Sequence, residues 1–155
     1  YSNTEDLTAP FTWALIFREA SGGSSNVGLF GKWSSSTQQS NIGRSGGAMA
    51  FRHGNDVGAG IVSFPNLYDT WRLAICSSNG TVCRAIVDGV RLTDSATNDT
   101  AATGTLYLGG FWGTDSFGFG GQVADVMMFN EDIIGNNPGA LALVLDYAKL
   151  YGIGA

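Results

Sequence analysis

"WRLAICSSNGTVCRAIVDG", residues 71–89, contains two apolar segments separated by a turn dipeptide. Asn79-Gly80 is typical of a two-residue β-hairpin loop, whose central residues take positive φ. A second turn, Asp88-Gly89, follows the second segment; glycine there supplies positive φ, and the aspartate side chain bonds to its own backbone. The stretch therefore predicts antiparallel strands joined by tight turns, which indicates a β protein.

The same stretch holds both cysteines of the chain, Cys76 and Cys83. A turn centred on Asn79-Gly80 places Cys76 opposite Cys83, close enough for a disulfide. By this count the pair occupies a hydrogen-bonded position, where the spacing is less suitable, so a disulfide and two free thiols both remain open. A redox site would need a CxxC motif and a zinc site two further ligands, so we expect a structural role.

Strand patterns continue through most of the chain. "FTWALIFRE", residues 11–19, alternates strictly, which is the period of a strand with two different faces. Further strands are predicted in "VGLFGKW", "GGAMAFRHG", "GAGIVSF", "GTLYLGG" and "GQVADVMMFN", with Gly, Asn and Asp between them. The polar run "SSSTQQSN", residues 34–41, is interpreted as a loop. In a sandwich, alternate positions fill the core, so we expect Trp13, Trp33 and Trp71 to be buried.

The C-terminal segment differs from the rest. "NNPGALALVLDYAKLYG" offers Asn137 as an N-cap, Pro138 at the first helical position and Gly152 as the end of the helix. Apolar residues recur at helical spacing at Leu141, Val144, Leu145 and Ala148. We therefore expect one short helix that packs on the sandwich.

Composition narrows the class of protein. The 155 residues suit a single domain, 1–155, and the absence of an initiator Met at Tyr1 suggests a piece of a longer chain. Hydrophobic residues make up 44% and glycine accounts for 23 positions, which favours many short strands over disorder. A net charge of −5 without a basic cluster argues against nucleic acid, and no apolar run is long enough to span a membrane.

The order of these segments resembles the laminin-G-like, concanavalin A-like lectin/glucanase superfamily. The family's Trp, strand, turn, strand and "vDG" pattern is matched by residues 71–89, and "LFGKW" resembles an early family strand. The tail "VLDYAKLYGI" also resembles the family's closing segment. The resemblance implies an all-β, two-sheet antiparallel jelly-roll β-sandwich with a short C-terminal helix, and its remaining matches are Gly109, Gly110, Phe119, Gly121, Val123, Val126, Phe129 and Asn130.

Some members of this superfamily are glycoside hydrolases, which need two carboxylates at a defined separation. The glucanase motif E-x-D-x-E is absent here. Glu19 has no partner at period two, Glu131 and Asp132 are adjacent and so face opposite ways, and Asp125 has no carboxylate two residues away. His53, beside a turn, is interpreted as a surface residue without a nucleophile motif. We therefore predict that the protein is not an enzyme.

Sugar binding is the favoured function. Lectin sites combine an aromatic ring with loop hydrogen-bond donors and acceptors. "GGFWGTDSFGFGG", residues 109–121, offers Trp112 for stacking and Asp115 for hydrogen bonds, and "FPNLYD" adds Asn66 and Tyr68. We predict a non-catalytic recognition or adhesion module that binds a glycan or a protein on a surface.

Three further expectations accompany this one. The resemblance makes calcium a candidate ligand through Asp56 with Asn55, or through Asp115, but no clustered acidic run specifies the metal ligands. The alternative function is a structural or decoration domain of a virion (phage capsid or tail) or an adhesin, assembled into a larger particle. Either function implies an extracellular, cell-surface or virion location.

Overall fold

The computed structural model describes residues 7–22, 26–35, 38–45, 47–54, 60–97, 102, 105–110 and 118–154. Strands dominate these residues, and helices occur only near the C-terminus. The strands are β1 Phe11–Glu19, β2 Val27–Ser35, β3 Gln38–Ser45, β4 Ala48–Gly54, β5 Ile61–Phe64, β6 Trp71–Ser78, β7 Val82–Val87, β8 Val90–Arg91, β9 Ser95–Ala96, β10 Thr105–Leu108 and β11 Gly121–Phe129. They are followed by helices α1 Ile133–Asn136 and α2 Pro138–Ala148 and the 3₁₀ turn η2 Lys149–Tyr151.

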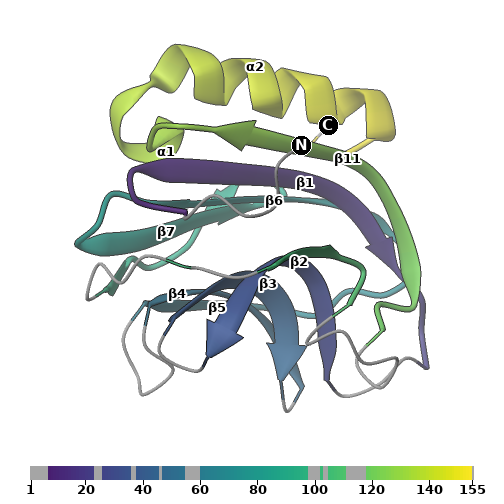
Figure 1. The fold of residues 1–155 in the computed structure, drawn as a ribbon. Helices are drawn as coiled ribbons and strands as arrows, with labels where there is room; N and C mark the ends of the chain where they lie inside the picture. Colours follow the sequence, from purple (N-terminus) through teal and green to yellow (C-terminus); the bar gives the residue numbers. More distant parts are fainter. Residues whose placement is uncertain are drawn as a thin grey trace.

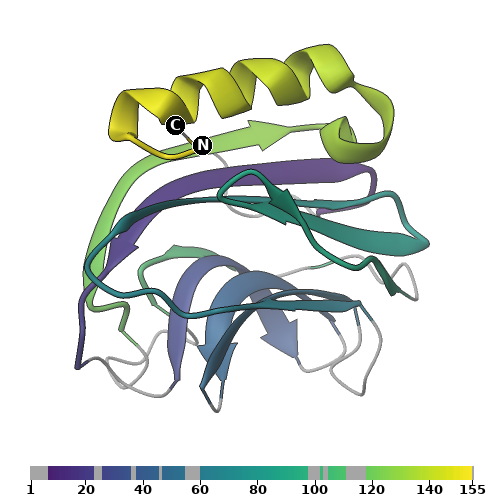
Figure 2. The ribbon, with the colours of Figure 1, turned by 180° about the vertical axis from the view of Figure 1, so that it is seen from behind.

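Two antiparallel sheets face each other. The six-stranded sheet has the order β11-β1-β6-β7-β8, with β9 beside β7, and the five-stranded sheet has the order β10-β2-β3-β4-β5. Helix α2 lies across the outer face of the six-stranded sheet, and the five-stranded sheet covers its other face (Figures 1 and 2). This arrangement confirms the predicted jelly-roll sandwich with a C-terminal helix. Within the described part of the chain, no helix is long and apolar enough to cross a membrane.

Strand β1 is buried on both faces, and of its residues only Arg18 is exposed. Phe11, Trp13, Leu15 and Phe17 belong to the inner core between the sheets, as the alternation predicts. The opposite face, through Ala14 and Ile16, joins an outer core beneath the helices. A strand sandwiched in this way contributes apolar burial on both sides, at about 25 cal/mol for each Å² removed from water.

Helix α2 provides the cover for the outer core. Asn137 caps it by accepting from the Ala140 N–H at 3.0 Å, Pro138 occupies the first turn, and Gly152 ends η2 in the left-handed conformation with φ 74°. Val144 and Ala148 are buried against the sheet. The predicted caps and buried face are therefore confirmed.

The interpretation of residues 34–41 as a loop is wrong, because Ser34 and Ser35 belong to β2 and residues 38–41 belong to β3. Strand β3 begins at Gln38 and pairs with β2 on one side and β4 on the other. Its sequence is polar, yet Gln39 and Asn41 are buried, and the Asn41 amide donates to Gln39 Oε1 at 2.6 Å. Pairing on both edges satisfies the backbone of this strand and outweighs its weak intrinsic β propensity.

The β6–β7 hairpin has a different register from the one predicted. Ser78 pairs with Cys83 and Cys76 with Ala85, so Cys76 does not face Cys83. Asn79 does not take positive φ; instead its Oδ1 accepts from the N–H groups of Thr81 and Val82, both at 3.0 Å, and lengthens the loop. Of the two possibilities left open by the sequence, the structure has two free thiols, and both are buried.

Two further residues lie elsewhere than expected. His53 is not on the surface; it is 1% exposed, and its ring packs edge-on against Phe11 with centroids 5.0 Å apart. It is cross-strand to Ser40 on the inner side of β4, two positions from Phe51, and so shares the face of that core residue. Trp71 is half-buried on the outer face at the start of β6, whereas Trp13 is in the core as predicted. The side chain of Trp33 lies outside the described set.

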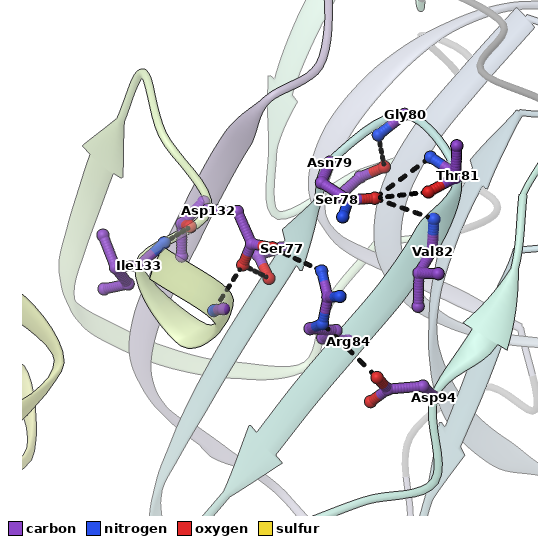
Figure 3. A network of polar contacts seen from close by, with 12 residues as sticks. Ser77, Ser78, Asn79, Gly80, Thr81, Val82, Arg84, Asp94, Asp132 and Ile133 are labelled. Carbon is purple, nitrogen blue, oxygen red and sulfur yellow. Dashed lines mark hydrogen bonds and ion pairs between the residues drawn. The ribbon is translucent and has the colours of Figure 1, made fainter. Parts of the chain in front are cut away.

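The connection from β11 to the helices is held by the buried carboxylate of Asp132. Its Oδ1 accepts from the Ser77 hydroxyl at 2.7 Å and from the Gly135 N–H at 2.9 Å, capping α1, while Oδ2 pairs with Arg84 (Figure 3). Arg84 also approaches Asp94, at 3.3 Å (Figure 3). Asp132 thus ties the C-terminal segment to strands β6 and β7.

We expect Asp132→Asn to lower the free energy of unfolding by about 3 kcal/mol or more, because it leaves Arg84 facing a neutral side chain in a buried network. The control is Asp146→Asn, whose exposed pair with Lys149 should contribute about 0.5 kcal/mol or less. Urea unfolding of both variants measures the difference. Equal stabilities would show that Asp132 does not hold this connection.

The two thiols should be unreactive in the folded protein. Burial raises the pKa of Cys76 well above that of an ordinary thiol, and burial likewise raises the pKa of Cys83 to about 11. At pH 9 an exposed thiol is largely ionised, whereas these should remain protonated and inaccessible to iodoacetamide. Mass analysis should find no adduct on the native protein and two after denaturation without reductant. A failure to label the denatured protein would instead indicate a disulfide.

Candidate functional site

One end of the sandwich gathers the loops that the sequence singles out. At this end β1 finishes at Glu19 beside Gly121, where β11 begins, and β6 begins with Trp71 beside Arg18. Strand β10 ends beside the start of β2, and β4 and β5 meet there through Met49 and Phe64. We call this end, with the described segments 19–22, 65–70, 109–110 and 118–121, the loop end. Of the predicted residues, Asn66 and Tyr68 belong to these segments, whereas Trp112 and Asp115 are outside the described residues.

A buried ion pair joins the two sheets at the loop end. Glu19, on β1, and Arg44, on β3, approach to 2.9 Å, and each side chain is only 3% exposed. Burial raises the pKa of the Glu19 carboxyl, while the nearby guanidinium groups of Arg44 and Arg72 act in the opposite direction. The sheets are thus connected by a charged contact that is shielded from water.

Tyr68 lies above this ion pair. Its hydroxyl accepts a hydrogen bond from Arg44 Nη1, and the Arg44 Cζ atom is 5.4 Å from the centre of the tyrosine ring. The side chain nevertheless remains 40% exposed. Tyr68 therefore presents an aromatic ring to solvent in an orientation that a buried guanidinium fixes.

The segment that carries Tyr68 is attached on both sides. The Asn66 Oδ1 atom accepts from the Met49 N–H at 2.9 Å, and its amide donates to the Gly47 carbonyl. Asp69, at φ 58°, donates its N–H to the Glu19 carbonyl at 2.7 Å. Asn66 is thus bonded to the β3–β4 turn, and Asp69 to the end of β1.

Arg72 and Asp88 complete the support beneath this segment. The Asp88 carboxylate accepts from Arg72 Nε and from the Leu73 N–H, both at 2.9 Å, and Arg72 Nη1 donates to the Pro65 carbonyl at 2.5 Å. The predicted turn is present, with Asp88 at φ 51° and Gly89 at φ 82°. The carboxylate, however, bonds to the neighbouring strand rather than to its own turn.

The aromatic loop 109–121 is anchored beside the same segment. The Gly109 N–H donates to the Leu29 carbonyl at 2.8 Å, and the Ala20 N–H donates to the Gly120 carbonyl at 2.8 Å. A Cβ on Gly121 would lie 2.2 Å from the Arg18 carbonyl oxygen, so the chain can begin β11 here only with glycine. Trp112 and Asp115 lie outside the described residues, but both ends of their loop reach this end of the sandwich.

The remaining candidate residues have structural partners. The Glu131 carboxylate accepts from the Asn137 amide at 3.0 Å, whereas Asp132 faces Arg84, so the two adjacent carboxylates bond to different partners. Asp125 accepts from two tyrosine hydroxyls. For calcium, the described residues contain no group of three or more His, Cys, Asp and Glu side chains that could hold a metal. Asn55 and Asp56 lie outside the described ranges.

Sequence reasoning did not find Arg44, Arg72 or their contacts. Arg44 ends a strand that the sequence did not predict, and Arg72 stands in a predicted strand without any motif. A charged residue on the inner face of a predicted strand indicates a buried ion pair, because such a charge requires a partner in the core. Glu19 follows the alternation of β1 onto that face, where Arg44 meets it.

Comparison with solved structures identifies the fold. Mouse laminin alpha1 chain, LG domains, superposes with a TM-score of 0.64 at 18% identity over 83% of this chain. The chain has the laminin-G-like, concanavalin A-like fold. It spans 37% of that laminin structure, and at this identity the likeness concerns architecture alone. No protein-family model and no curated protein matches the sequence.

Other solved structures with this laminin-G-like fold come from different classes of protein. Domain 4 of an extracellular arabinanase from Geobacillus stearothermophilus, solved with arabinotriose, has a TM-score of 0.67 at 14% identity and covers 92% of this chain and 69% of its own. A heptameric SAP-like pentraxin from Limulus polyphemus has a TM-score of 0.58 at 14% identity, covering 84% and 68%.

The Glu19–Arg44 pair should matter for stability in a pH-dependent way. Arg44→Met leaves a buried carboxylate unpaired, and we expect a loss of about 3–5 kcal/mol at pH 7. Without Arg44 the Glu19 pKa rises further, so the folded state takes up a proton and part of the loss should be recovered as the pH falls towards 4.5.

Glu19→Gln/Arg44→Met removes both charges and should be more stable at pH 7 than Arg44→Met alone. Arg91→Met, which breaks a half-exposed pair with Asp94, is the control and should cost about 1 kcal/mol or less. Urea titrations at the two pH values measure these effects. A loss in Arg44→Met that does not change with pH would contradict the role of Glu19.

Proposed function

We propose that this domain is a non-catalytic recognition module that binds carbohydrate at the loop end. The observation that carries the proposal is Tyr68, an exposed ring held on the Arg44 guanidinium beside the base of an aromatic, glycine-rich loop. Aromatic rings stack on the apolar faces of sugars, while neighbouring polar groups hydrogen-bond to hydroxyls.

The rigidity of this position favours binding. An exposed tyrosine normally loses rotamer freedom when a ligand orders it, at about 0.5–1.5 kcal/mol for each immobilised side chain. Here the hydroxyl of Tyr68 is already bonded to Arg44, and Asn66 and Asp69 fix the backbone on either side. In this proposal Trp112 stacks on the sugar and Asp115 hydrogen-bonds to it, while Asn66 shapes the loop.

The contacts of the acidic residues support a role without catalysis. Glycoside hydrolysis requires a free acid and a second carboxylate across the bond. Glu19 is paired with Arg44 below the surface, and Asp88 is paired with Arg72 at 2.8 Å. Glu19 and Asp88 are therefore used in holding the loops, and the exposed Asp69 carboxylate accepts from the Ser21 N–H at 3.4 Å.

Solved structures of this fold supply a further argument. The arabinanase domain was solved in complex with arabinotriose, which is a sugar ligand on a domain of similar architecture. We further propose that the domain belongs to a longer extracellular, cell-surface or virion protein, and that calcium, if bound, is held by loop residues outside the described set.

Tyr68→Ala should weaken glycan binding by about 1–3 kcal/mol, the range for loss of a central aromatic contact. Tyr68→Phe keeps the ring and should retain most of the affinity. Leu150→Ala is the matched control, because Leu150 is 78% exposed and lies at the C-terminal end of the helices. A glycan array, run with calcium and with chelator, should identify a ligand, and calorimetry should then compare the variants and Trp112→Ala.

Two results would redirect this proposal. Binding that Tyr68→Ala and Trp112→Ala both leave unchanged would place the site elsewhere on the domain. Failure to bind any glycan would favour the alternative, a structural or decoration domain of a virion or an adhesin. The exposure of Leu143 (72%) and Leu150 on the helical face is the observation that favours such an assembly role.

A further inference from the structure

Within the described residues, the helices do not cover the outer face of the six-stranded sheet along its whole length. Helix α2 ends while β1 and β11 continue past its C-terminal end towards the loop end (Figure 1). Arg18 is next to the end of β1 and Gln122 is next to the start of β11, and both are exposed. A short length of open sheet therefore lies next to the proposed glycan site.

Three side chains stand in one row across this open sheet. Arg18 pairs with Gln122 of β11 on one side and with Trp71 of β6 on the other. Directly opposed residues of antiparallel strands project from the same face, with Cβ atoms about 4.5–5.5 Å apart. The row thus places an amide, a guanidinium and an indole side by side.

Arg18 differs from the other basic residues of the chain. All eight lysines and arginines lie within the described residues. Five have ion pairs at the distances of a salt bridge, and two more, Lys32 and Arg52, also have contacts. Among the basic side chains in the described part of the chain, that of Arg18 alone has no hydrogen bond or ion pair. In a protein of net charge −5, this leaves one free guanidinium, at the open sheet.

Aromatic rings border the row on the helix side. The rings of Trp71 and Tyr151 are 5.8 Å apart, and Tyr147 follows at 6.0 Å from Tyr151. Both tyrosine hydroxyls donate to Asp125 Oδ2, at 2.5 Å from Tyr151 and 3.1 Å from Tyr147. The hydrogen bond to Asp125 raises the pKa of Tyr151, so its ring stays neutral. Asp125 therefore fixes the rings and is not paired with Arg18.

We propose that the row of Gln122, Arg18 and Trp71, bordered by Tyr151, is a subsite for a carboxylate-bearing sugar such as a uronic acid. A guanidinium binds a carboxylate through two parallel hydrogen bonds, and an indole face accepts the apolar side of a pyranose ring. The amide of Gln122 serves the sugar hydroxyls. This inference rests on the proposed function, because it names the class of glycan that extends from the loop end onto the open sheet.

The test compares trigalacturonic acid with its methyl ester, which has the same rings without the charge. Wild-type protein should bind the free acid about tenfold more tightly, which corresponds to about 1.4 kcal/mol, because the ester lacks the charge that strengthens a hydrogen bond to the guanidinium. Arg18→Gln should remove this preference while leaving affinity for the ester unchanged. Arg91→Gln, which changes an exposed arginine already paired with Asp94, is the control and should retain the preference.

Calorimetry of both ligands with the three proteins separates the outcomes, with thermal unfolding to confirm that each variant is folded. Equal binding of acid and ester, or a preference that survives Arg18→Gln, would overturn the subsite and leave the proposed function intact. Tight binding of a sulfated disaccharide without binding of the uronate would overturn the assignment to a carboxylate. Failure of every glycan, neutral or acidic, would overturn the proposed function and this inference with it.

Discussion

The structure depends on the burial of strand β1 from both sides. Inner residues such as Trp13 require the five-stranded sheet, and outer residues such as Ile16 require the helices. Neither face could be left to water without exposing a continuous apolar strip in the middle of the larger sheet. The second sheet and the C-terminal helix are therefore both required by the nine residues of β1, because each of them buries one of its two faces.

Polar contacts at the ends of β1 then determine where the loops lie. At one end, Thr12 donates to the Glu131 carbonyl at 2.6 Å and accepts from the Ile133 N–H at 3.1 Å, which fixes the start of the helical segment. At the other end, Glu19 reaches across to Arg44, and its carbonyl holds the segment that bears Tyr68. The surface offered to a ligand is thus positioned by groups that are themselves buried.

Much of the fold can be predicted from the sequence, because local sequence patterns determine many of its elements. The alternation of residues 11–19, the Asn137 cap and the Asp88-Gly89 turn each have a physical cause within a few residues. Strand β3 and the burial of His53 have no such local cause, since partners distant in sequence determine both. Tyr68 and Asn66 were candidate residues from the sequence alone, but the Arg44 contact that orients Tyr68 follows from the meeting of two sheets. The cysteine register failed because an Asn79 side chain, by accepting three hydrogen bonds, made a longer loop than the dipeptide suggests.

The position of β1 in the sheet also bears on how the chain is made. Strand β1 lies between β6 and β11, and helix α2, which ends at Ala148, covers its outer face. Strand β1 therefore cannot be fully buried until β11 and α2 have been synthesised. Contacts between residues so far apart in the sequence form slowly, because the entropic cost of closing a large loop comes before the contacts can stabilise the chain. A nascent chain that has not yet released β11 from the ribosome presents β1 with an open edge and an uncovered apolar face. Pauses in translation before β11 and α2 are complete would therefore prolong the period in which this domain is exposed to aggregation and dependent on chaperones.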